Sequence, residues 1–261
     1  MNPIEPIETL SFVPITGLPE IQPGDDLVGL LDRSLGATQQ APLKHGDVLV
    51  ISQKIVSKSE NRYIDLAKVE PSVEARALAA RCGKDPRLVE LVLRESTEIL
   101  RIAPQVLIVR HRLGFVVANA GIDQSNLPQG GERALLLPAN PDASAEVLRQ
   151  RLEQRYGLRI AVLISDSFGR AWRLGLTGVC IGCSGLMPLV NLRGTPDRNG
   201  RPLQITELAL ADQLCATATL VCGEAAEGRP MVLVRGVPPA YFAVGRGARE
   251  LLRPLAQDLF R

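Results

Sequence analysis

The chain has 261 residues, of which 46% are hydrophobic and 22% are charged, the balance of an ordinary globular protein. At about 150 residues per domain, this length predicts one large or two small domains. The formal net charge of +2 and the 3% of aromatic residues argue against a nucleic-acid-binding protein, which needs a basic face or stacking side chains. Because no run of about 18 apolar residues occurs, the sequence predicts no association with a membrane through a spanning helix.

The first residues and the cysteines indicate the compartment. Residues 1–5 have neither the basic nor the apolar part of a signal peptide. The five cysteines are an odd and sparse set, which argues against a disulfide framework. We therefore expect reduced thiols in a cytoplasmic protein.

The first half of the chain predicts short helices and strands in mixed order. Asp25-Asp26, Ser72 and Asp85-Pro86 are typical helix starts, and each precedes apolar residues at helical spacing. Shorter apolar runs between turns have the length of strands. The predicted helices are 27–35, 73–82 and 86–99, the predicted strands are 10–15 and 48–52 (continuing toward 56), and residues 106–118 form a predicted hairpin.

The second half adds the elements that complete an α+β class. One helix is expected to begin at Asp142 or Ser144 and end at Gly157, and another to begin at Thr206 and run through Leu220. The predicted strands are 135–137, 160–164 and 231–234. Helices and strands do not alternate strictly, so the sequence predicts mixed sheets with flanking helices. The long connections 120–134 and 167–205 are expected to carry function.

Two aspartates leave apolar strands in the same way. Asp166 follows Ala161-Val162-Leu163-Ile164 and stands beside Ser167, while Asp123 follows Gly121-Ile122. Ligands gather at the carboxyl ends of strands, and carboxylate and hydroxyl oxygens suit a hard divalent cation. A turn or helix cap explains Asp166 equally well.

Lysines and glutamates form two further candidates. If residues 53–58 are extended, Lys54 and Lys58 share one face and could hold phosphate oxygens, although a solvated strand face explains them better without context. Glu224 and Glu227 lie in a loop of small residues, where a carboxylate could complete a metal site. An ordinary surface loop is equally compatible.

The remaining patterns give weaker evidence for a functional site. Neither a Gly-x4-Gly-Lys-Ser/Thr loop nor a Gly-x-Gly-x-x-Gly turn after a strand is present. Cys180 and Cys183 are a lone pair, for which buried thiols are favoured over zinc, because structural zinc normally has four ligands. The two histidines, at turns or strand ends, give weak support for a nucleophile–histidine pair. Trp172, in a polar loop, is expected to contact a ligand, a subunit or its own loop.

An ordered set of short motifs resembles one family over nearly the whole chain, the coenzyme F-420-0:L-glutamate ligases. Each motif is weak alone, and the ordered set is specific. The motifs are Gly17-Leu18-Pro19-Glu20, Gly24-Asp25-Asp26-Leu27, Gly46-Asp47-Val48-Leu49-Val50, Lys54-Ile55-Val56-Ser57-Lys58, Ala120-Gly121-Ile122-Asp123-x-Ser125-Asn126, Leu136-Leu137-Pro138, Ser165-Asp166-Ser167-x-Gly169-Arg170, Arg193-Gly194-Thr195-x-Asp197, Gly200-Arg201, Ala211-Asp212 and Val234-Arg235-Gly236.

The resemblance implies a GTP-dependent ligase that joins L-glutamate to the deazaflavin coenzyme F-420-0 through an acyl phosphate and then adds γ-linked glutamate. It implies two magnesium or manganese ions, an activating potassium ion, a homodimer, and one ligase domain over 1–261 with two intertwined subdomains. Asp123, Asp166 and Lys58 are expected to act in catalysis. The expected metal ligands are Asp123 and Asp166 for one ion, with Ser167 and Glu224 for the other. The expected nucleotide site consists of Gly17, Leu18, Pro19, Glu20, Gln53, Lys54, Lys58, Asn126, Cys222, Gly223, Glu224, Ala225, Ala226, Glu227, Gly228 and Arg229.

Three positions depart from the family pattern. Ser167 stands where threonine is common and keeps the hydroxyl, whereas Gln53 replaces a usual serine and leaves its nucleotide contact open. Asn61-Arg62 replaces a common Gly-Arg without an evident chemical consequence. The chain ends at Arg261, so no nitroreductase-like activity is expected. The competing hypotheses are a γ-glutamyl ligase acting on another pterin- or flavin-like acid and a GTP-binding module without catalysis.

Overall fold

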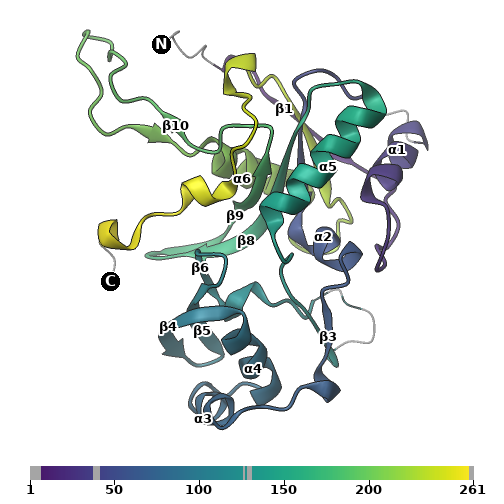
Figure 1. Ribbon diagram of the computed structural model, residues 1–261, viewed down its shortest axis with the longest axis vertical. Coiled ribbons are helices and arrows are strands. Elements are labelled where there is room, and N and C mark those ends of the chain that lie inside the picture. Colours follow the sequence, from purple (N-terminus) through teal and green to yellow (C-terminus); the bar gives the residue numbers. More distant parts are fainter. Residues whose placement is uncertain (1–6, 38–41, 126, 128–130, 259–261) are drawn as a thin grey trace.

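The computed structural model describes residues 7–125, 127 and 131–258, apart from 38–41, and has an elongated shape (Figure 1). We call residues 7–62 and 136–258 the body and residues 63–135 the lobe. Figure 1 shows the body above and the lobe, with β4, β5, α3 and α4, below. Helices and strands are mixed in both parts, which confirms the predicted α+β class. The predicted extent of one domain with two intertwined subdomains stays a prediction.

One mixed sheet forms the centre of the body. Its strands run in the order β1-β12-β2-β8-β9, and β2 and β8 are parallel neighbours whereas the other neighbours are antiparallel. The strands are β1 (Ser11–Ile15), β2 (Val48–Ser52), β8 (Ala161–Arg170), β9 (Arg173–Ser184) and β12 (Met231–Arg235).

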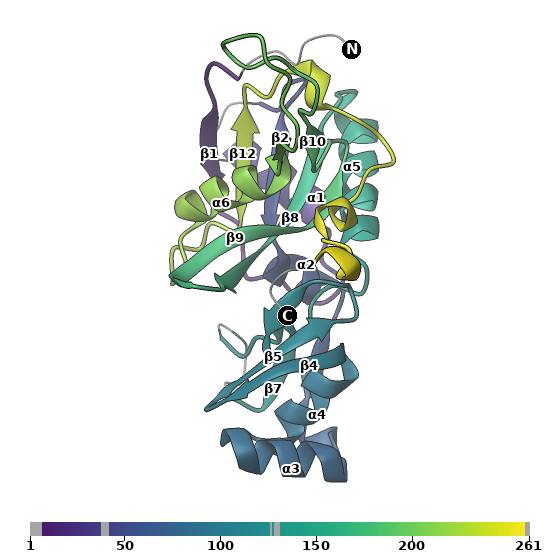
Figure 2. The same cartoon turned by 90° about the vertical axis from the view of Figure 1, so that its left-hand side faces the viewer.

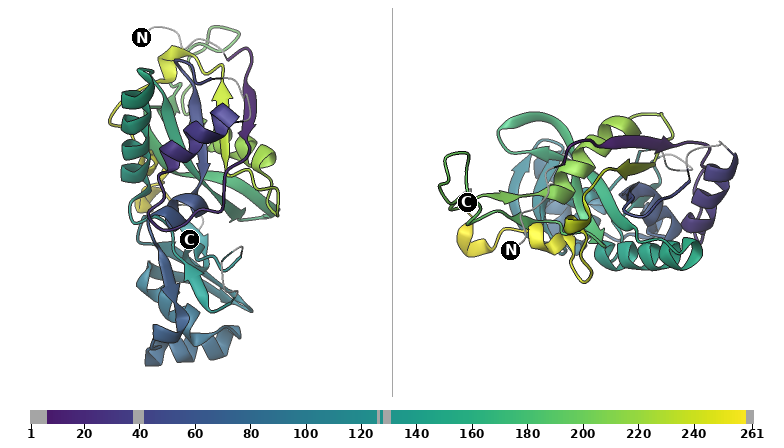
Figure 3. Two further views of the ribbon diagram at one scale, coloured as in Figure 1. Left: turned by 90° about the vertical axis from the view of Figure 1, so that its right-hand side faces the viewer. Right: turned by 90° about the horizontal axis from the view of Figure 1, so that it is seen from above.

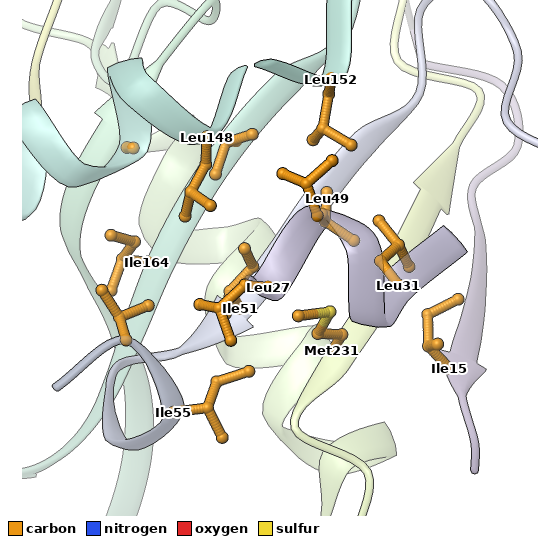
Figure 4. Packing of buried hydrophobic residues seen from close by; sticks show 14 of the residues in the cluster. Ile15, Leu27, Leu31, Leu49, Ile51, Ile55, Leu148, Leu152, Ile164 and Met231 are labelled. Carbon is orange, nitrogen blue, oxygen red and sulfur yellow. The ribbon is translucent and has the colours of Figure 1, made fainter. Parts of the chain in front are cut away.

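Helices cover both faces of this sheet. Leu49 and Ile51 of β2 pack on the side of α1 (Leu27–Ala37) and α5 (Pro141–Tyr156), as Figure 4 shows. Val48 and Val50 face the side of α6 (Leu210–Cys222). Figures 2 and 3 show α5 and α6 on opposite sides of the sheet. Because both faces are covered, β2 is a continuous apolar run without polar alternation.

Glycines on β9 let α5 and α6 approach closely. A Cβ atom at Gly178 would lie 2.5 Å from the carbonyl oxygen of Cys215 on α6, and one at Gly182 would lie 2.5 Å from that of Pro141 on α5. The two helices also hold the backbone of β9, because Asp212 accepts a hydrogen bond from the Cys180 N–H and Asp142 accepts one from the Cys183 N–H, both at 2.9 Å.

The lobe is smaller and has two cores of its own. Its three-stranded antiparallel sheet packs on two helices. A second sheet has two strands, which are the first and the last strand of the lobe in chain order. These elements are β3 (Tyr63–Asp65), α3 (Val73–Cys82), α4 (Pro86–Arg94), β4 (Ser96–Ala103), β5 (Val106–His111), β6 (Val116–Ala118) and β7 (Arg133–Leu135).

Short elements complete the described part of the chain. The helix α2 (Gln53–Ser59) follows β2 directly, and β10 (Val190–Asn191) pairs with β11 (Glu207–Leu208). The 3-10 helices are η1 (Leu66–Lys68), η2 (Asn119–Gly121), η3 (Pro239–Tyr241), η4 (Ala248–Leu251) and η5 (Leu255–Gln257). No helix among the described residues is long and apolar enough to span a membrane.

Several predicted boundaries are confirmed by their caps. Ser72 accepts a hydrogen bond from the Ala75 N–H at 3.1 Å, and Asp85 accepts one from the Arg87 N–H at 2.8 Å. Gly83 and Gly157 end α3 and α5 in the left-handed conformation that glycine favours. The hairpin predicted over 106–118 is formed by β5 and β6.

Other predictions were wrong where strand pairing or a different helix start decided the structure. Residues 53–59 form a helix and no strand extension, Ile99 lies on β4, β8 continues through Ser165–Ser167, and much of 167–184 is paired strand. Asn140 caps α5, and α6 begins at Leu210 after the short strand β11. β7 covers 133–135, since it pairs with β3 there.

Candidate active site

A cavity of about 730 Å³ lies where the body meets the lobe. Its wall includes the carboxyl ends of the parallel strands β2 and β8, the start of α2, the lobe segment 117–123 and the loop 222–230. Ser52 and Ser165 are register partners at this end of the β2–β8 pair. A site at the carboxyl ends of parallel strands is the usual position for a ligand.

A strained turn delivers Asp123 from the lobe. Asn119, Ala120 and Gly121 have φ values of 50°, 55° and 65°, and a Cβ atom at Gly121 would lie 2.9 Å from Leu137 Cδ1. Beyond the turn, the backbone of Asp123 exchanges hydrogen bonds with Leu135 at 3.0 and 2.8 Å. The turn and this bridge direct the Asp123 carboxylate toward the body.

Lys54 connects the body to Asp123. Its Nζ lies 2.7 Å from Asp123 Oδ2 and 3.0 Å from Ser125 Oγ, and both members of the ion pair are 23% exposed. The N–H and hydroxyl of Ser125 donate to Asp123 Oδ1 at 2.7 and 2.8 Å. Burial would raise the pKa of Asp123, but these donors together hold the pKa below its usual value, so the carboxylate is ionised.

Asp166 has the opposite electrostatic environment. Burial raises the pKa of Asp166 to about 7, and the negative charge of Asp123 adds to the rise. The Ser167 N–H, Lys54 and the side chain of Gln53 oppose it. A buried carboxyl group beside an ionised carboxylate is a pair that a cation would stabilise.

The loop after α6 brings a third carboxylate to the cavity. The Ser167 hydroxyl is 2.8 and 3.0 Å from the two oxygens of Glu224. The turn that carries Glu224 needs glycine at Gly223, where φ is 80° and a Cβ atom would lie 2.2 Å from the Glu227 carboxyl carbon. Glu227 in turn accepts from the Ala225 N–H at 2.9 Å.

Lys58 is the second lysine of α2 that lines the cavity. Its ammonium group pairs with Glu20, and its side chain is 5% exposed, whereas that of Glu20 is 61% exposed. Leu18 and Pro19 line the wall beside this pair. Lys54 and Lys58 are four residues apart on a helix and not on a strand, yet both reach the same cavity because helical residues four apart share a face.

Comparison with known proteins identifies the family. Residues 16–236 match the family model described as F420-0:Gamma-glutamyl ligase. The chain belongs to the F420-0:gamma-glutamyl ligase family. A protein of Methanopyrus kandleri named coenzyme F420:L-glutamate ligase is 44% identical over 98% of this chain and 99% of its own length. Proteins of the same name from Methanothermobacter thermautotrophicus and Archaeoglobus fulgidus are 43% and 40% identical over 97% and 95% of this chain, and 99% and 95% of their own lengths.

Most residues that the ligase family resemblance assigned to the site line this one cavity. Gly17 is not among the lining residues, and Asn126 lies outside the described residues. The lining residues from the predicted set are Leu18, Pro19, Glu20, Gln53, Lys54, Lys58, Asp123, Asp166, Ser167, Cys222, Gly223, Glu224, Ala225, Ala226, Glu227, Gly228 and Arg229.

Sequence reasoning missed hydroxyl groups at the cavity. Ser165 Oγ is buried and has no hydrogen-bond partner among the described residues, and Thr219 of α6 also lines the wall. The expectation that β8 ends before Ser165 hid the first of these. The long connection 167–205 contributes only Ser167, Gly169 and Leu176.

The metal-binding capacity of this ligase-family site rests on oxygen atoms. Among the described residues, no three His, Cys, Asp or Glu side chains gather into a ready metal cage. The donors come as two pairs, Asp123 with Asp166 and Ser167 with Glu224. Hard oxygen donors with open positions fit magnesium or manganese, which keep phosphate and water oxygens as further ligands.

The cysteines and Trp172 are the remaining sequence candidates. All five cysteines are free, and Cys180, Cys183 and Cys215 are buried. Cys222 lines the cavity, and burial raises its pKa to about 11, which disfavours the reactive thiolate. Trp172 is 89% exposed at the turn between β8 and β9.

Proposed function

We propose that this protein ligates L-glutamate to the deazaflavin coenzyme F-420-0 with consumption of GTP, through an acyl-phosphate intermediate, in coenzyme F-420 biosynthesis. The observation that carries the proposal is the meeting of Asp123, Asp166, Glu224 and two lysines in one cavity. The names of the relatives supply the acid and the amino acid.

The charge of the cavity supports a nucleotide held with cations. The described lining residues include five carboxylates and three basic groups, so the wall itself would repel a triphosphate. Divalent ions would reverse this balance. The acidic residues are Glu20, Asp123, Asp166, Glu224 and Glu227, and the basic residues are Lys54, Lys58 and Arg229.

The two oxygen pairs are the proposed metal ligands. Asp123 and Asp166 would hold one magnesium or manganese ion, and Ser167 and Glu224 a second. Bound there, the ions would supply neutralisation of phosphate charge, the main requirement of phosphoryl transfer. Lys54 and Lys58 would add two ammonium groups to the same region.

The proposed reaction needs no side-chain nucleophile. A carboxylate oxygen of the precursor forms a bond to the γ-phosphorus of GTP. At the same time, the bond between the γ-phosphorus and the β,γ-bridging oxygen breaks, and GDP leaves. The amine of L-glutamate then attacks the acyl carbon, phosphate leaves, and the amine loses a proton to form the amide. The chain's task is to hold two anions in line, which replaces a costly encounter in solution.

The proposal includes finer properties that the ligase resemblance implied. We expect further γ-linked glutamate addition, activation by potassium, and a cytoplasmic location. We also expect a homodimer. The β8–β9 hairpin supports this last expectation, because Trp172, Leu174 and Leu176 expose large apolar side chains at its tip.

An assay of GDP release tests the function. Purified protein with GTP and Mg²⁺ is expected to release GDP only when both L-glutamate and F-420-0 are present, with mass spectrometry detecting glutamate-bearing products. Release that requires glutamate and a different pterin- or flavin-like acid would favour the alternative ligase. GTP turnover indifferent to glutamate would reject ligation, and binding without turnover would indicate a non-catalytic module.

A further inference from the structure

The chain passes between the body and the lobe twice, and the two crossings lie side by side. Arg62 is the last residue of the body before the lobe, and Leu136 is the first residue after it. The Leu136 N–H donates a hydrogen bond of 3.1 Å to the carbonyl oxygen of Arg62. The orientation of the lobe, and with it the position of Asp123, therefore depends on what holds these crossings.

Glu95, between α4 and β4 of the lobe, pairs with two arginines that reach the backbone of the body. Arg112 Nε lies 2.9 Å from Glu95 Oε2, and Nη1 of the same arginine donates to the Ala139 carbonyl oxygen at 3.0 Å. Arg62 Nη2 lies 3.6 Å from the same oxygen of Glu95. The Arg62 Nε donates to the Leu137 carbonyl oxygen at 2.9 Å. One carboxylate oxygen thus ties both arginines to the first residues after the second crossing.

The Leu137 end of this network leads to Asp123. Leu137 is fully buried, and its Cδ1 atom fills the space beside Gly121 in the strained turn before Asp123. The hydrogen bond from Arg62 holds the backbone of this leucine. Asp123 itself is bridged to Leu135, two residues before Leu137. Because packed interiors tolerate little displacement, the arginine network fixes the two segments that carry Asp123.

His111 makes a second connection from Glu95 to the body. Its Nδ1 accepts a hydrogen bond from the Leu113 N–H at 3.0 Å, so a neutral ring carries its proton on Nε2. This Nε2 lies 3.5 Å from Glu95 Oε2. The ring stacks on Phe115 with 5.1 Å between centroids, and Phe115 packs on Phe168 at 5.2 Å. Phe168 lies on β8, the strand that carries the other aspartate of the cavity.

The charge of Glu95 serves these contacts and no ligand. Burial would raise the pKa of Glu95, but His111, Arg112 and Arg62 together hold the pKa below its usual value, so the carboxylate is ionised. None of these four residues is among those that line the cavity. An effect of Glu95 on the site therefore has to pass through the position of the lobe.

We propose that Glu95 is a positioning residue, which fixes the lobe against the body and so sets where Asp123 lies relative to Asp166. The role rests on the proposed function only in that these two aspartates are taken to share a divalent cation. The second proposed metal pair, Ser167 with Glu224, lies within the body. Loss of the Glu95 charge is therefore expected to weaken the first cation site and to leave the second unchanged.

Glu90 offers a matched control inside the lobe. Its side chain is 12% exposed, against 13% for Glu95, and it pairs with Arg94 at 2.9 Å. Its other oxygen accepts a hydrogen bond from the Ser72 N–H at 2.9 Å, so these contacts stay within the lobe. Glu90→Gln thus removes a carboxylate of equal burial and similar pairing without touching the crossings.

Hydrogen exchange followed by mass spectrometry tests the positioning in the absence of any ligand. In Glu95→Gln, exchange in segments 119–123 and 135–139 is expected to be about 10-fold faster, because hydrogen bonds to a charged group are lost. Segment 161–166 of β8 should exchange as in the wild type. Glu90→Gln should leave all three segments unchanged.

A second variant keeps the test open if Glu95→Gln does not fold. Arg112→Lys retains the positive charge beside Glu95 and loses the forked contact that also reaches Ala139. It is expected to speed exchange in the same two segments by a smaller factor. Circular dichroism verifies the fold of each variant.

Binding of Mn²⁺ alone, followed by electron paramagnetic resonance of the free ion, tests the consequence for each cation site. The Glu224→Gln background keeps the site shared by the two aspartates, and the Asp123→Asn background keeps the site within the body. In the first background, Glu95→Gln is expected to raise the Kd for Mn²⁺ about 3- to 10-fold. In the second background it should leave the Kd unchanged, which a general loss of structure would not do.

Four results would overturn the proposal: unchanged exchange in segment 119–123, an unchanged Kd in the first background, equal loss of Mn²⁺ affinity in both backgrounds, or the same effects in Glu90→Gln. Failure of the proposed function looks different. A wild-type protein that binds no Mn²⁺ would reject the metal sites, while the exchange experiment would still decide whether Glu95 holds the lobe.

Discussion

The body and the lobe each supply one aspartate to the cavity, and each part holds its aspartate in a different way. Asp166 lies on β8, which pairs with β2 on one side and β9 on the other and is buried over 161–165. Asp123 follows a turn of three residues with positive φ, and it is held by a backbone bridge to Leu135 and by Lys54. The body thus fixes its carboxylate through the sheet, and the lobe through local strain and one ion pair.

This difference also appears in the strands. The residues of β2 in the body are buried almost throughout, whereas those of β4 in the lobe are partly or fully exposed. A sheet covered on both faces tolerates little displacement. We infer that the geometry of the cavity depends on contacts that cross from body to lobe, among them the ion pair of Lys54 with Asp123.

The largest expected effect comes from the two aspartates. Asp123→Asn and Asp166→Asn are each expected to lower the rate of GDP release about 1000-fold, the scale of removing one group that stabilises transition-state charge. Both variants should keep the wild-type circular dichroism spectrum. Asp26→Asn, at an exposed position of the body, is the control. Near-normal turnover in either variant would remove that carboxylate from the site.

Breaking the contact between body and lobe should cost less. Lys54→Met removes a positioned charge and leaves Asp123 without its ion pair, so GDP release is expected to fall about 10- to 100-fold. Lys68→Met, whose side chain is 83% exposed in the lobe, is the matched control. Equal activities of the two variants would show that the lobe holds Asp123 without Lys54.

The close packing of α5 on β9 predicts a stability effect in the body. Gly182→Ala would place a methyl group 2.5 Å from the Pro141 carbonyl oxygen and is expected to lower the free energy of unfolding by about 1–3 kcal/mol. Gly36→Ala, in α1 with nothing within 4 Å, should be neutral or raise it by up to about 1 kcal/mol. Urea unfolding measures both. Equal effects would contradict close packing of α5 on β9.

The smallest effect concerns acid stability of the body. Hydrogen bonds from Arg149 and Ser184 lower the pKa of Glu146 from 4.5 to about 2. A lowered pKa gives stability above the unfolded value and loses it as the pH falls through the folded one. Glu146→Gln is therefore expected to be less stable at pH 7, with a difference that shrinks between pH 4.5 and 2. Urea unfolding of both proteins between pH 7 and pH 2 measures the difference, and a difference that stays constant over this range would contradict the expectation.

Local chemistry allowed much of this fold to be predicted. The caps at Ser72, Asp85 and Gly157 depend on residues within a few positions, and they were found at the expected places. The sequence motifs at 17–20, 54–58, 120–126 and 165–170 also indicated part of the cavity wall, because each of these four carries several lining residues at short spacing.

Tertiary structure decided what local chemistry leaves open. Residues 53–59 became helix where the strand 48–52 was expected to continue toward 56, and β8 extended past Ser165 because β9 supplied hydrogen-bonding partners. The Lys54–Asp123 ion pair and the contact of Ser167 with Glu224 arise only when separate segments meet. The amino-acid sequence determined the segments and their chemical groups. Packing alone determined which groups face one another, because long-range pairing and burial depend on residues far apart in the chain.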